Sequence, residues 1–410
     1  MRRVVVTGLG AVSPIGNTVN ELWDGILNHQ CGIDNITLFD TTNHKCKLAA
    51  EVKNLDFDQY FNARDLKFND RFTKFARIAA KQALEDSKLD INGIEDRVGV
   101  IVASGIGGVE SIENAQTNLL NKGPSRVSPY FIPMSLVNLA SGNVAIDLNA
   151  KGNCSSAVTA CAAGTNAIGD AYLRIKFDLE DVIFAGGSEA AITPLAIAGF
   201  SALRALNHTE DKNRASIPFD ASRAGFVMGE GSGILVLEEL EHALKRNAKI
   251  YGEIIGYGST CDAYHVTAPL SDGLGGSKAM QNAIKDAKIN KEDISYINAH
   301  GTSTPLNDSI ETKAIKDCFK EHAYNLKVSS TKSNTGHLLG ATGAIEAIIT
   351  LKSLQEGVIP ATINYKEKDE ACDLDIVPNK CLKQDITYAM SNSLGFGGHN
   401  ASLIFKKWEG

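Results

Sequence analysis

One cysteine of this 410-residue chain stands in a context that suits nucleophilic chemistry. Cys161 follows a polar loop and precedes a run rich in Ala and Gly, which predicts a position at or near the N-terminus of a helix. The helix dipole and the free amide groups there favour the thiolate, which is the nucleophilic form. Small neighbouring residues would let a substrate approach the sulfur closely. The alternative, an inert buried cysteine, fits this context less well.

Two histidines stand in comparable contexts. His300 follows the apolar run 294–297, which predicts a strand whose end delivers the imidazole into a site. His337 ends a polar, glycine-containing loop that runs into a strongly apolar helix, and a weak internal repeat places it at the position that mirrors Cys161. A histidine near a helix N-terminus is biased toward the neutral form, which can accept or donate a proton. Taken singly, each histidine could instead be a loop or capping residue.

A carboxylate lies inside that same apolar helix. Glu346 follows His337 by nine residues, and burial there is costly unless a cation pairs with it. We expect Lys332 to be that cation. The glycine clusters at 105–108 and 395–398 lack the flanking residues of nucleotide-binding loops, so close approach to a substrate is the better interpretation. No short-spaced set of Cys and His predicts a zinc site.

The composition is typical of a globular protein with a large core, with 43% hydrophobic and 22% charged residues. The net charge is −7 and no long basic run occurs, which argues against nucleic acid or an anionic membrane as a partner. No apolar run predicts a membrane span, and the first residues resemble a strand rather than a signal peptide. We expect a cytoplasmic enzyme, or one of a plastid-type stroma whose transit peptide has been removed. The eight cysteines include no Cys-x-x-Cys pair and are expected to be reduced thiols.

Strands and helices alternate along the chain, which predicts an α/β fold with helices covering sheets. Buried strands are predicted at 4–7, 98–102, 182–185 and 234–237, and a helix at 72–84. Residues 366–383 are predicted to form an irregular surface segment.

The two halves of the chain repeat each other weakly. Glycine turns near residues 230 and 396 each lead into an apolar strand, and a helix with almost no polar face precedes each. Such helices are usually buried on all sides. We therefore predict an N-terminal half, residues 1–249, that carries the cysteine and a C-terminal half, residues 250–410, that carries both histidines. Their buried helices would face each other between two sheets.

Four motifs in order give the chain a specific resemblance. They are Thr159-Ala-Cys161-Ala-Ala-Gly, Asn298-Ala-His300-Gly-Thr-Ser-Thr, Lys332-Ser-Asn-Thr-Gly-His337 and Gly395-Phe396-Gly-Gly-His-Asn. Over nearly the whole chain the sequence resembles the 3-oxoacyl-acyl-carrier-protein synthases, and within them the long-chain elongating type II. The resemblance implies a thiolase-like fold of two duplicated halves in a five-layer αβαβα sandwich. It also implies a homodimer and no cofactor.

The resemblance implies a decarboxylating Claisen condensation of type II fatty acid synthesis. Cys161 would take an acyl group from acyl carrier protein, and malonyl-carrier protein would then lose carbon dioxide to give an enolate that attacks the Cys161 thioester. His300 and His337 would donate hydrogen bonds to the thioester oxygen as its charge develops. One of them is expected to activate water, and their residue type does not say which. Backbone N–H groups of Cys161 and Phe396 would form the oxyanion hole.

The resemblance also assigns supporting roles. Lys332, Glu346 and Asp308 are expected to support the histidines electrostatically or structurally, and Phe396 is expected to gate access to Cys161. Ile106, Phe131 and Phe200 match acyl-channel positions, and Thr302, Thr304 and Gly395 match other substrate-binding positions. Asn298, Glu346 and Ser391 match a monovalent-cation site. Because the carrier protein is acidic, we expect a locally basic docking face made of Arg64, Lys67, Arg126 and Arg204.

Several alternatives differ in their site residues. A thiolase would place a second cysteine in the late glycine turn, whereas Cys372 and Cys381 lie outside it. A synthase III-like enzyme would pair Cys and His with Asn rather than with a second His. A polyketide ketosynthase uses the same three residues, so it stays open, although chain length and whole-chain likeness favour fatty acid synthesis. A catalytically inactive partner subunit that sets chain length would lack the nucleophile. His399, where bacterial relatives often carry Thr, is one departure from the pattern.

Overall fold

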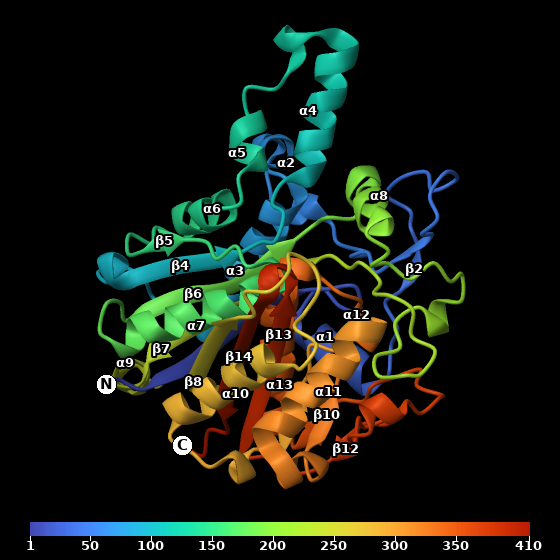
Figure 1. Cartoon of the computed structure of the whole chain (residues 1–410). Coiled ribbons are helices and arrows are strands. Elements are labelled where there is room, and N and C mark those ends of the chain that lie inside the picture. The colour runs from blue at the N-terminus through green and yellow to red at the C-terminus, as the bar shows by residue number, and fades with distance from the viewer.

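A computed structural model describes all 410 residues of the chain (Figure 1). Ten strands form one hydrogen-bonded series in the order β10-β9-β13-β14-β8-β1-β7-β6-β4-β5. Its N-terminal sheet comprises β1 (Val4–Val12), β4 (Val98–Ala103), β5 (Cys154–Ser155), β6 (Val182–Glu189) and β7 (Gly231–Glu239). Its C-terminal sheet comprises β8 (Gly252–Cys261), β9 (Tyr296–Asn298), β10 (Lys327–Ser329), β13 (Tyr388–Gly395) and β14 (His399–Lys406). The two sheets join where the start of β1 pairs antiparallel with β8 over three residue pairs.

The two sheets have the same topology. Numbered within its own half, each sheet runs in the order third, second, fourth, fifth and first strand. In each sheet the third, second and fourth strands are parallel, and the fifth strand pairs antiparallel with both of its neighbours. This confirms the predicted duplication of the fold. The division at residues 249 and 250 stays a prediction.

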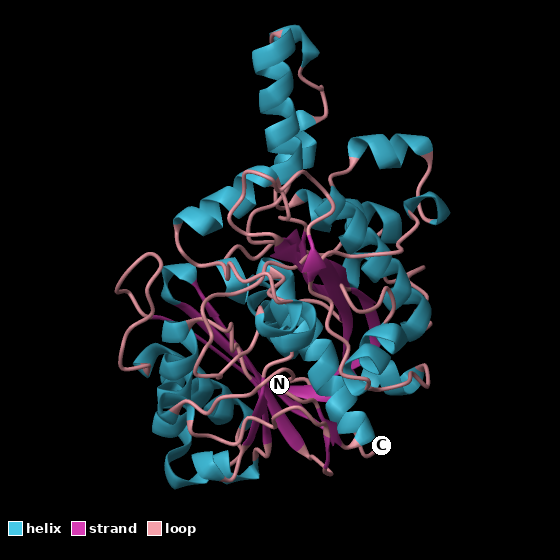
Figure 2. Cartoon of the chain, turned by 90° about the vertical axis from the view of Figure 1, so that its right-hand side faces the viewer, coloured by secondary structure: helices cyan, strands magenta, loops and turns pink.

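Helices form three layers around the two sheets (Figures 1 and 2). The outer layer on the N-terminal sheet contains α3 (Arg71–Ser87) and α6 (Leu139–Leu148), and that on the C-terminal sheet contains α10 (Leu274–Ala287) and α11 (Pro305–Phe319). Between the sheets lie α7 (Ala163–Lys176) and α13 (Thr342–Glu356), whose apolar residues join those of both sheets in one core. The predicted five-layer sandwich is therefore correct, and its middle layer is made of the two apolar helices.

Glycines let the two central helices touch. A Cβ at Gly164 would lie 2.8 Å from the carbonyl oxygen of Gly340, and one at Gly343 would lie 2.1 Å from Thr165 Oγ1. Glycine also lets strands pass close to their neighbours, since a Cβ at Gly186 would lie 1.9 Å from the Gly233 carbonyl oxygen. The strand predicted at 182–185 therefore does not end at Gly186 and Gly187, and β6 continues through both glycines.

The remaining elements connect or edge these layers. They are α1 (Val19–Leu27), α2 (Ala63–Phe68), α8 (Pro194–Ala202), α9 (Leu240–Lys245), α12 (Lys332–Thr335) and the ribbons β2 (Asp34–Asn35) with β3 (Leu48–Ala49) and β11 (Val358–Ile359) with β12 (Leu382–Lys383). The segment 366–383 is largely irregular and exposed, as the sequence predicts, but part of it is buried. Cys372, Leu374 and Ile376 are buried in the core outside the C-terminal sheet, because the segment packs beside α11.

An arm projects from the body, with α4 (Val109–Lys122) and α5 (Phe131–Ser135) at the top of Figures 1 and 2. Several of its large apolar side chains are exposed, namely Ile112, Leu119, Leu120, Ile132 and Leu136. None of the helices combines the length and the apolar character that a membrane crossing would need.

Candidate active site

One cavity of about 410 Å³ lies where the two halves of the fold meet, and residues of both halves line it. Cys161 comes from the turn before α7, His300 from the loop after β9, and His337 from the loop before α13. Phe396 comes from the turn between β13 and β14. The structure thus brings together the nucleophile and both histidines that the sequence predicts.

The turn that carries Cys161 has a counterpart in the other half. A 3-10 turn at Ala160–Ala162 leads into α7, and one at Leu339–Ala341 leads into α13. Each turn begins with a left-handed residue, since φ is 49° at Ala160 and 48° at Leu339.

When the two turns are aligned, Gly340 occupies the position equivalent to that of Cys161. The predicted mirror relationship between His337 and Cys161 is therefore wrong, because His337 lies three residues before Gly340, outside the turn. The repeat aligns backbone turns, and the histidine belongs to the loop that precedes one of them.

The surroundings of the Cys161 thiol favour its protonated form. Burial raises the pKa of the thiol to about 12, and the Glu189 carboxylate acts in the same direction. The Lys332 ammonium and the backbone N–H groups of Phe396 and Cys161 act in the opposite direction and lower the pKa. The residue keeps some surface open to the cavity, but the sulfur lies deep in the protein and is poorly solvated. Desolvation thus opposes the preference for the thiolate that the helix terminus predicts, and the charge state of the sulfur stays a prediction.

The two histidines are buried and neutral. Their ring centres lie 5.3 Å apart with an interplanar angle of 85°. Burial lowers the pKa of both imidazoles well below 6.5, and the Lys332 ammonium acts in the same direction. His337 Nδ1 lies 3.0 Å from Thr342 Oγ1, whereas His337 Nε2 and His300 Nδ1 are buried without a partner in the protein. Neutral imidazoles agree with the sequence prediction.

A buried ion pair supports the histidines. Lys332 Nζ lies 2.5 Å from Glu346 Oε1, and both side chains are almost fully buried, which confirms the predicted pairing. Lys332 also donates to the His300 carbonyl oxygen, so the pair is tied to a catalytic loop. Burial raises the pKa of Glu346 to about 7, against the opposing effect of Lys332. Removing either partner would leave an uncompensated charge in the core.

Two further buried carboxylates hold the loops of the site. Glu311 accepts hydrogen bonds from the backbone N–H groups of His300 at 2.8 Å and Gly301 at 2.7 Å. Glu189, at the end of β6, accepts from the N–H groups of Gly105, Ile106 and Gly340 and from the Ser104 hydroxyl. Sequence reasoning missed both residues. The signal for Glu189 was a carboxylate that closes an otherwise apolar strand.

The turn at Gly395 and Phe396 packs against the nucleophile. A Cβ at Gly395 would lie 3.2 Å from the Cys161 nitrogen and 3.0 Å from the Thr159 carbonyl oxygen, so a side chain here would crowd the backbone that carries the nucleophile. The Phe396 ring lies 6.4 Å from that of Phe200, and both rings line the cavity. This places Phe396 where a gate to Cys161 would have to be.

The other predicted substrate residues divide into two groups. Phe200, Thr302, Thr304 and Gly395 line the cavity, and Ile106 packs in the same apolar cluster as Cys161 and Phe200. Phe131 lies on α5 in the arm and does not line the cavity.

The four predicted docking residues are exposed, and none forms an ion pair within the chain. Arg64 and Lys67 lie on α2, Arg126 follows α4, and Arg204 follows α8 and lines the cavity. These elements lie on the upper side of the molecule in Figure 1.

The predicted cation residues carry buried polar atoms, and two of the residues are neighbours. Asn298 and Ser391 are paired residues of the parallel strands β9 and β13. The side-chain oxygen and nitrogen of Asn298, Ser391 Oγ and Glu346 Oε2 are all buried without a partner in the protein. Buried polar atoms are normally satisfied, so oxygen atoms in this condition fit a hard monovalent cation. Asp308 lies apart from them, behind the turn at Thr302–Thr304, where it accepts hydrogen bonds from backbone N–H groups.

A buried cysteine, two neutral histidines and a glycine turn against the sulfur define the site of a carbon–carbon condensing enzyme. The chain belongs to the beta-ketoacyl synthase family: residues 1–243 match the model described as "Beta-ketoacyl synthase, N-terminal domain", and residues 251–366 match the C-terminal one. This confirms the family resemblance on which the site assignment was built.

Curated relatives match along the whole chain. It is 53% identical over 410 residues to the 3-oxoacyl-[acyl-carrier-protein] synthase 2 of Synechocystis sp., covering all of this chain and 99% of the relative. It is 54% identical over 409 residues to the protein of the same name from Staphylococcus aureus, with the same coverage.

Solved structures of related proteins have the same fold as this chain. A chain of a complex described as a type II PKS acyl-carrier protein with its ketosynthase bound to the hexaketide has a TM-score of 0.92 at 35% identity. A beta-ketoacyl synthase from Burkholderia phymatum has a TM-score of 0.93 at 34% identity. Both matches cover 100% of each chain.

Proposed function

We propose that the chain is the elongating condensing enzyme of type II fatty acid synthesis, joining acyl-carrier protein and malonyl-carrier protein into 3-oxoacyl-carrier protein. The observation that carries this is the convergence of Cys161, His300 and His337 in one cavity of a chain more than half identical to two synthases 2. The products are the 3-oxoacyl-carrier protein, carbon dioxide and free carrier protein.

The first step is transfer of the acyl group to Cys161. The sulfur attacks the thioester carbonyl of the acyl-carrier protein, a new C–S bond forms, and the carrier's C–S bond breaks. Because burial keeps the Cys161 thiol protonated, its proton leaves as the sulfur attacks and ends on the departing carrier thiol. The N–H groups of Cys161 and Phe396 are the donors for the oxyanion that forms in between, a contribution of about 100- to 1,000-fold per donor.

The second step is loss of carbon dioxide from the malonyl thioester. The electron pair of the broken C–C bond moves onto the thioester oxygen, where negative charge develops. Neutral His300 and His337 can each donate an N–H to that oxygen, and they stabilise charge only where it appears. Lys332 and Glu346 hold this arrangement through the ion pair and the bond to the His300 carbonyl.

The third step joins the two carbon chains. The enolate carbon attacks the acyl thioester of Cys161, a C–C bond forms, and the Cys161 sulfur leaves with its electron pair. The enolate oxygen returns its electron pair to re-form the carbonyl, and a proton from solvent converts the departing thiolate to the thiol. The raised pKa of the thiol favours this uptake of one proton per cycle.

The polyketide alternative shares the fold and the three residues, and one solved match belongs to a polyketide complex. Identity to that chain is 35%, against 53% and 54% for the synthases 2, which favours fatty acid synthesis. The inactive-subunit alternative lacks support because Cys161 is present and faces the cavity.

Carrier protein and a second copy of the chain are the proposed partners. The exposed, unpaired Arg64, Lys67, Arg126 and Arg204 suit an acidic carrier. For the homodimer, support comes from the exposed apolar side chains of the arm and from β5, an exposed edge strand beside it. A dimer would also explain why Phe131 lies outside the cavity of its own chain.

The cation site and the location of the enzyme also stay proposals. Asn298, Glu346 and Ser391 would hold a monovalent cation, which would supply a fixed positive charge behind the His300 loop. A cytoplasmic or plastid-stroma location remains an expectation from sequence.

The proposed function is tested by turnover with a panel of acyl-carrier proteins from short to long, together with malonyl-carrier protein. The expected result is release of carbon dioxide coupled to a 3-oxoacyl product two carbons longer than the acyl substrate. Absence of any extended product across the panel, with folded enzyme, would contradict the proposal.

A further inference from the structure

One wall of the cavity is a sharp turn that presents two hydroxyl groups. Thr302 Oγ1 and Thr304 Oγ1 lie 2.9 Å apart, and both residues line the cavity. Ser303 between them is buried and left-handed, with φ of 66°. A residue with a side chain adopts this conformation only where its surroundings enforce it. The relative position of the two threonines therefore depends on what holds Ser303.

Every polar atom of Ser303 is held from the side away from the cavity. Its N–H donates to Asp308 Oδ2 at 3.1 Å, its hydroxyl oxygen accepts from the Ile217 N–H at 2.9 Å, and its carbonyl accepts from the Gly225 N–H at 3.0 Å. Asp308 Oδ2 also accepts from the Phe219 N–H at 2.8 Å. The turn is thus built against the loop 217–225.

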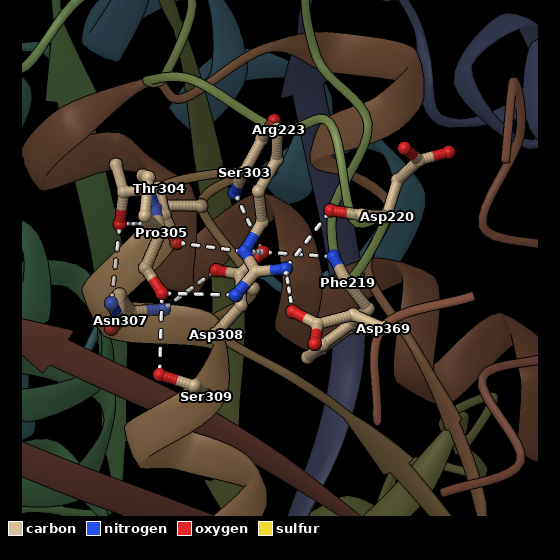
Figure 3. A network of polar contacts seen from close by, with 12 residues as sticks. Phe219, Asp220, Arg223, Ser303, Thr304, Pro305, Asn307, Asp308, Ser309 and Asp369 are labelled. Carbon is tan, nitrogen blue, oxygen red and sulfur yellow. Dashed lines mark hydrogen bonds and ion pairs between the residues drawn. The ribbon is translucent and has the colours of Figure 1, made fainter. Parts of the chain in front are cut away.

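Arg223 lies at the centre of this network, and Figure 3 shows its guanidinium surrounded by oxygen atoms. Its Nε donates to the Thr304 carbonyl at 3.1 Å and its Nη2 to the Pro305 carbonyl at 2.9 Å. Its Nη1 donates to the Asp220 carbonyl at 2.9 Å and to Asp369 Oδ2 at 2.5 Å.

The charge of Arg223 is balanced within the same network. Its Nε lies 3.6 Å from Asp308 Oδ2, and its side chain is 5% exposed. The guanidinium does not line the cavity, so it cannot contact a substrate there. It can act only through the turn that it holds.

We propose that Arg223 is a positioning residue that fixes the paired hydroxyls of Thr302 and Thr304 by holding the turn from behind. The paired hydroxyls would orient polar atoms of the arm on which the carrier protein delivers the thioester. The inference rests on the proposed function, since it concerns binding of carrier-linked substrates. The planar guanidinium has five N–H donors in a fixed arrangement and reaches four acceptors on three chain segments. A lysine ammonium at this position cannot reach all four.

The test is Arg223→Lys, with Arg246→Lys as the matched control. Arg246 makes a comparable set of bonds, two to the Glu238 carboxylate and one to the Ser87 carbonyl, and does not line the cavity. For Arg223→Lys we expect KM for malonyl-carrier protein to rise about three- to tenfold, the effect of losing about one hydrogen bond to the substrate. The kcat and the rate of Cys161 alkylation by iodoacetamide should change less than about twofold. Arg246→Lys should change thermal stability alone.

A double-variant cycle shows whether Arg223 acts through the threonines. Thr302→Val removes one hydroxyl of the pair, and the cap of α11 stays in place because Thr304 provides it. We expect Arg223→Lys to raise KM by less than about twofold in the Thr302→Val background. Should Arg223→Lys lose much more thermal stability than the control, Asp369→Asn replaces it. Asp369→Asn removes the negative charge that faces the guanidinium, weakens that contact and should raise KM in the same direction.

An unchanged KM in Arg223→Lys, and in Asp369→Asn where that variant replaces it, overturns the proposal. So does a KM effect of full size in the Thr302→Val background. Turnover by the wild-type chain tests the proposed function separately, because it does not depend on either variant.

Discussion

His300 and His337 meet edge to face across the cavity, with ring centres 5.3 Å apart and an interplanar angle of 85°. Burial favours the neutral form of both rings, in which each ring carries one N–H that can donate a hydrogen bond. Two donors in this arrangement can converge on one oxygen. This is the geometry that loss of carbon dioxide from a malonyl thioester requires.

We expect His300→Ala and His337→Ala each to slow malonyl decarboxylation by about 100- to 1,000-fold, because each removes one donor to the developing enolate. Release of labelled carbon dioxide from malonyl-carrier protein measures this. Acyl transfer to Cys161 provides the control and should persist in both variants. Normal decarboxylation in both would refute the assignment of the pair.

The raised pKa of Cys161 predicts a steep pH dependence of its alkylation. A thiol with a pKa of about 12 has little thiolate at neutral pH, so the rate with iodoacetamide should rise about tenfold per pH unit from pH 7 to 9 without a plateau. Peptide mass spectrometry measures modification of Cys161, with the exposed Cys261 as an internal reference for the reagent. A plateau of the Cys161 rate below pH 9 would show that the thiolate is already present in the resting protein.

Glu189 supplies negative charge near the nucleophile. Glu189→Gln should lower the pKa of Cys161 and speed its alkylation at pH 7.5, as a thiolate no longer faces a carboxylate. The same change should lower the free energy of unfolding by about 1–3 kcal/mol, because the amide nitrogen cannot accept the backbone N–H groups that the carboxylate binds. Alkylation kinetics and chemical denaturation measure the two effects. Slower alkylation at an unchanged fold would count against this electrostatic role.

Contact between the central helices predicts an effect of glycine substitution on stability. Gly343→Ala places a Cβ 2.1 Å from Thr165 Oγ1, and the overpacking should lower the free energy of unfolding by about 1–3 kcal/mol. Gly199→Ala on α8 is the control, because its Cβ would meet nothing within 4 Å and alanine favours the helix by about 0.5–1 kcal/mol. Denaturant unfolding compares the two variants. Equal stability of both would contradict the tight contact between α7 and α13.

Sequence reasoning found the residues whose type and context are local signals. Cys161 and His337 each stand where a loop leads into a helix, and His300 stands just after a strand. The apolar flanks of Glu346 revealed its burial and its partner Lys332. The duplication was visible as two glycine turns and two apolar helices.

The site residues that sequence reasoning missed depend on contacts that only the folded chain brings about. Glu189 binds the backbone of a loop 151 residues away, and no local pattern encodes that contact. Glu311 binds a loop only 10 and 11 residues before it, but nothing in its local context marks that role. The helix terminus beside Cys161 can be read from sequence, whereas the desolvation that raises the pKa of its thiol depends on both halves of the fold. Arg223 escaped notice for the same reason, since its acceptors come from three separate segments.

The central claim is that Cys161 holds the growing acyl chain. Its most direct test is to incubate the protein with acyl-carrier protein alone, without malonyl substrate, and to map the acylated residue by peptide mass spectrometry. We predict one acyl group per chain on Cys161, discharged when malonyl-carrier protein is added, and none in Cys161→Ala. Acyl label on another residue, or chain extension by Cys161→Ala, would contradict the account.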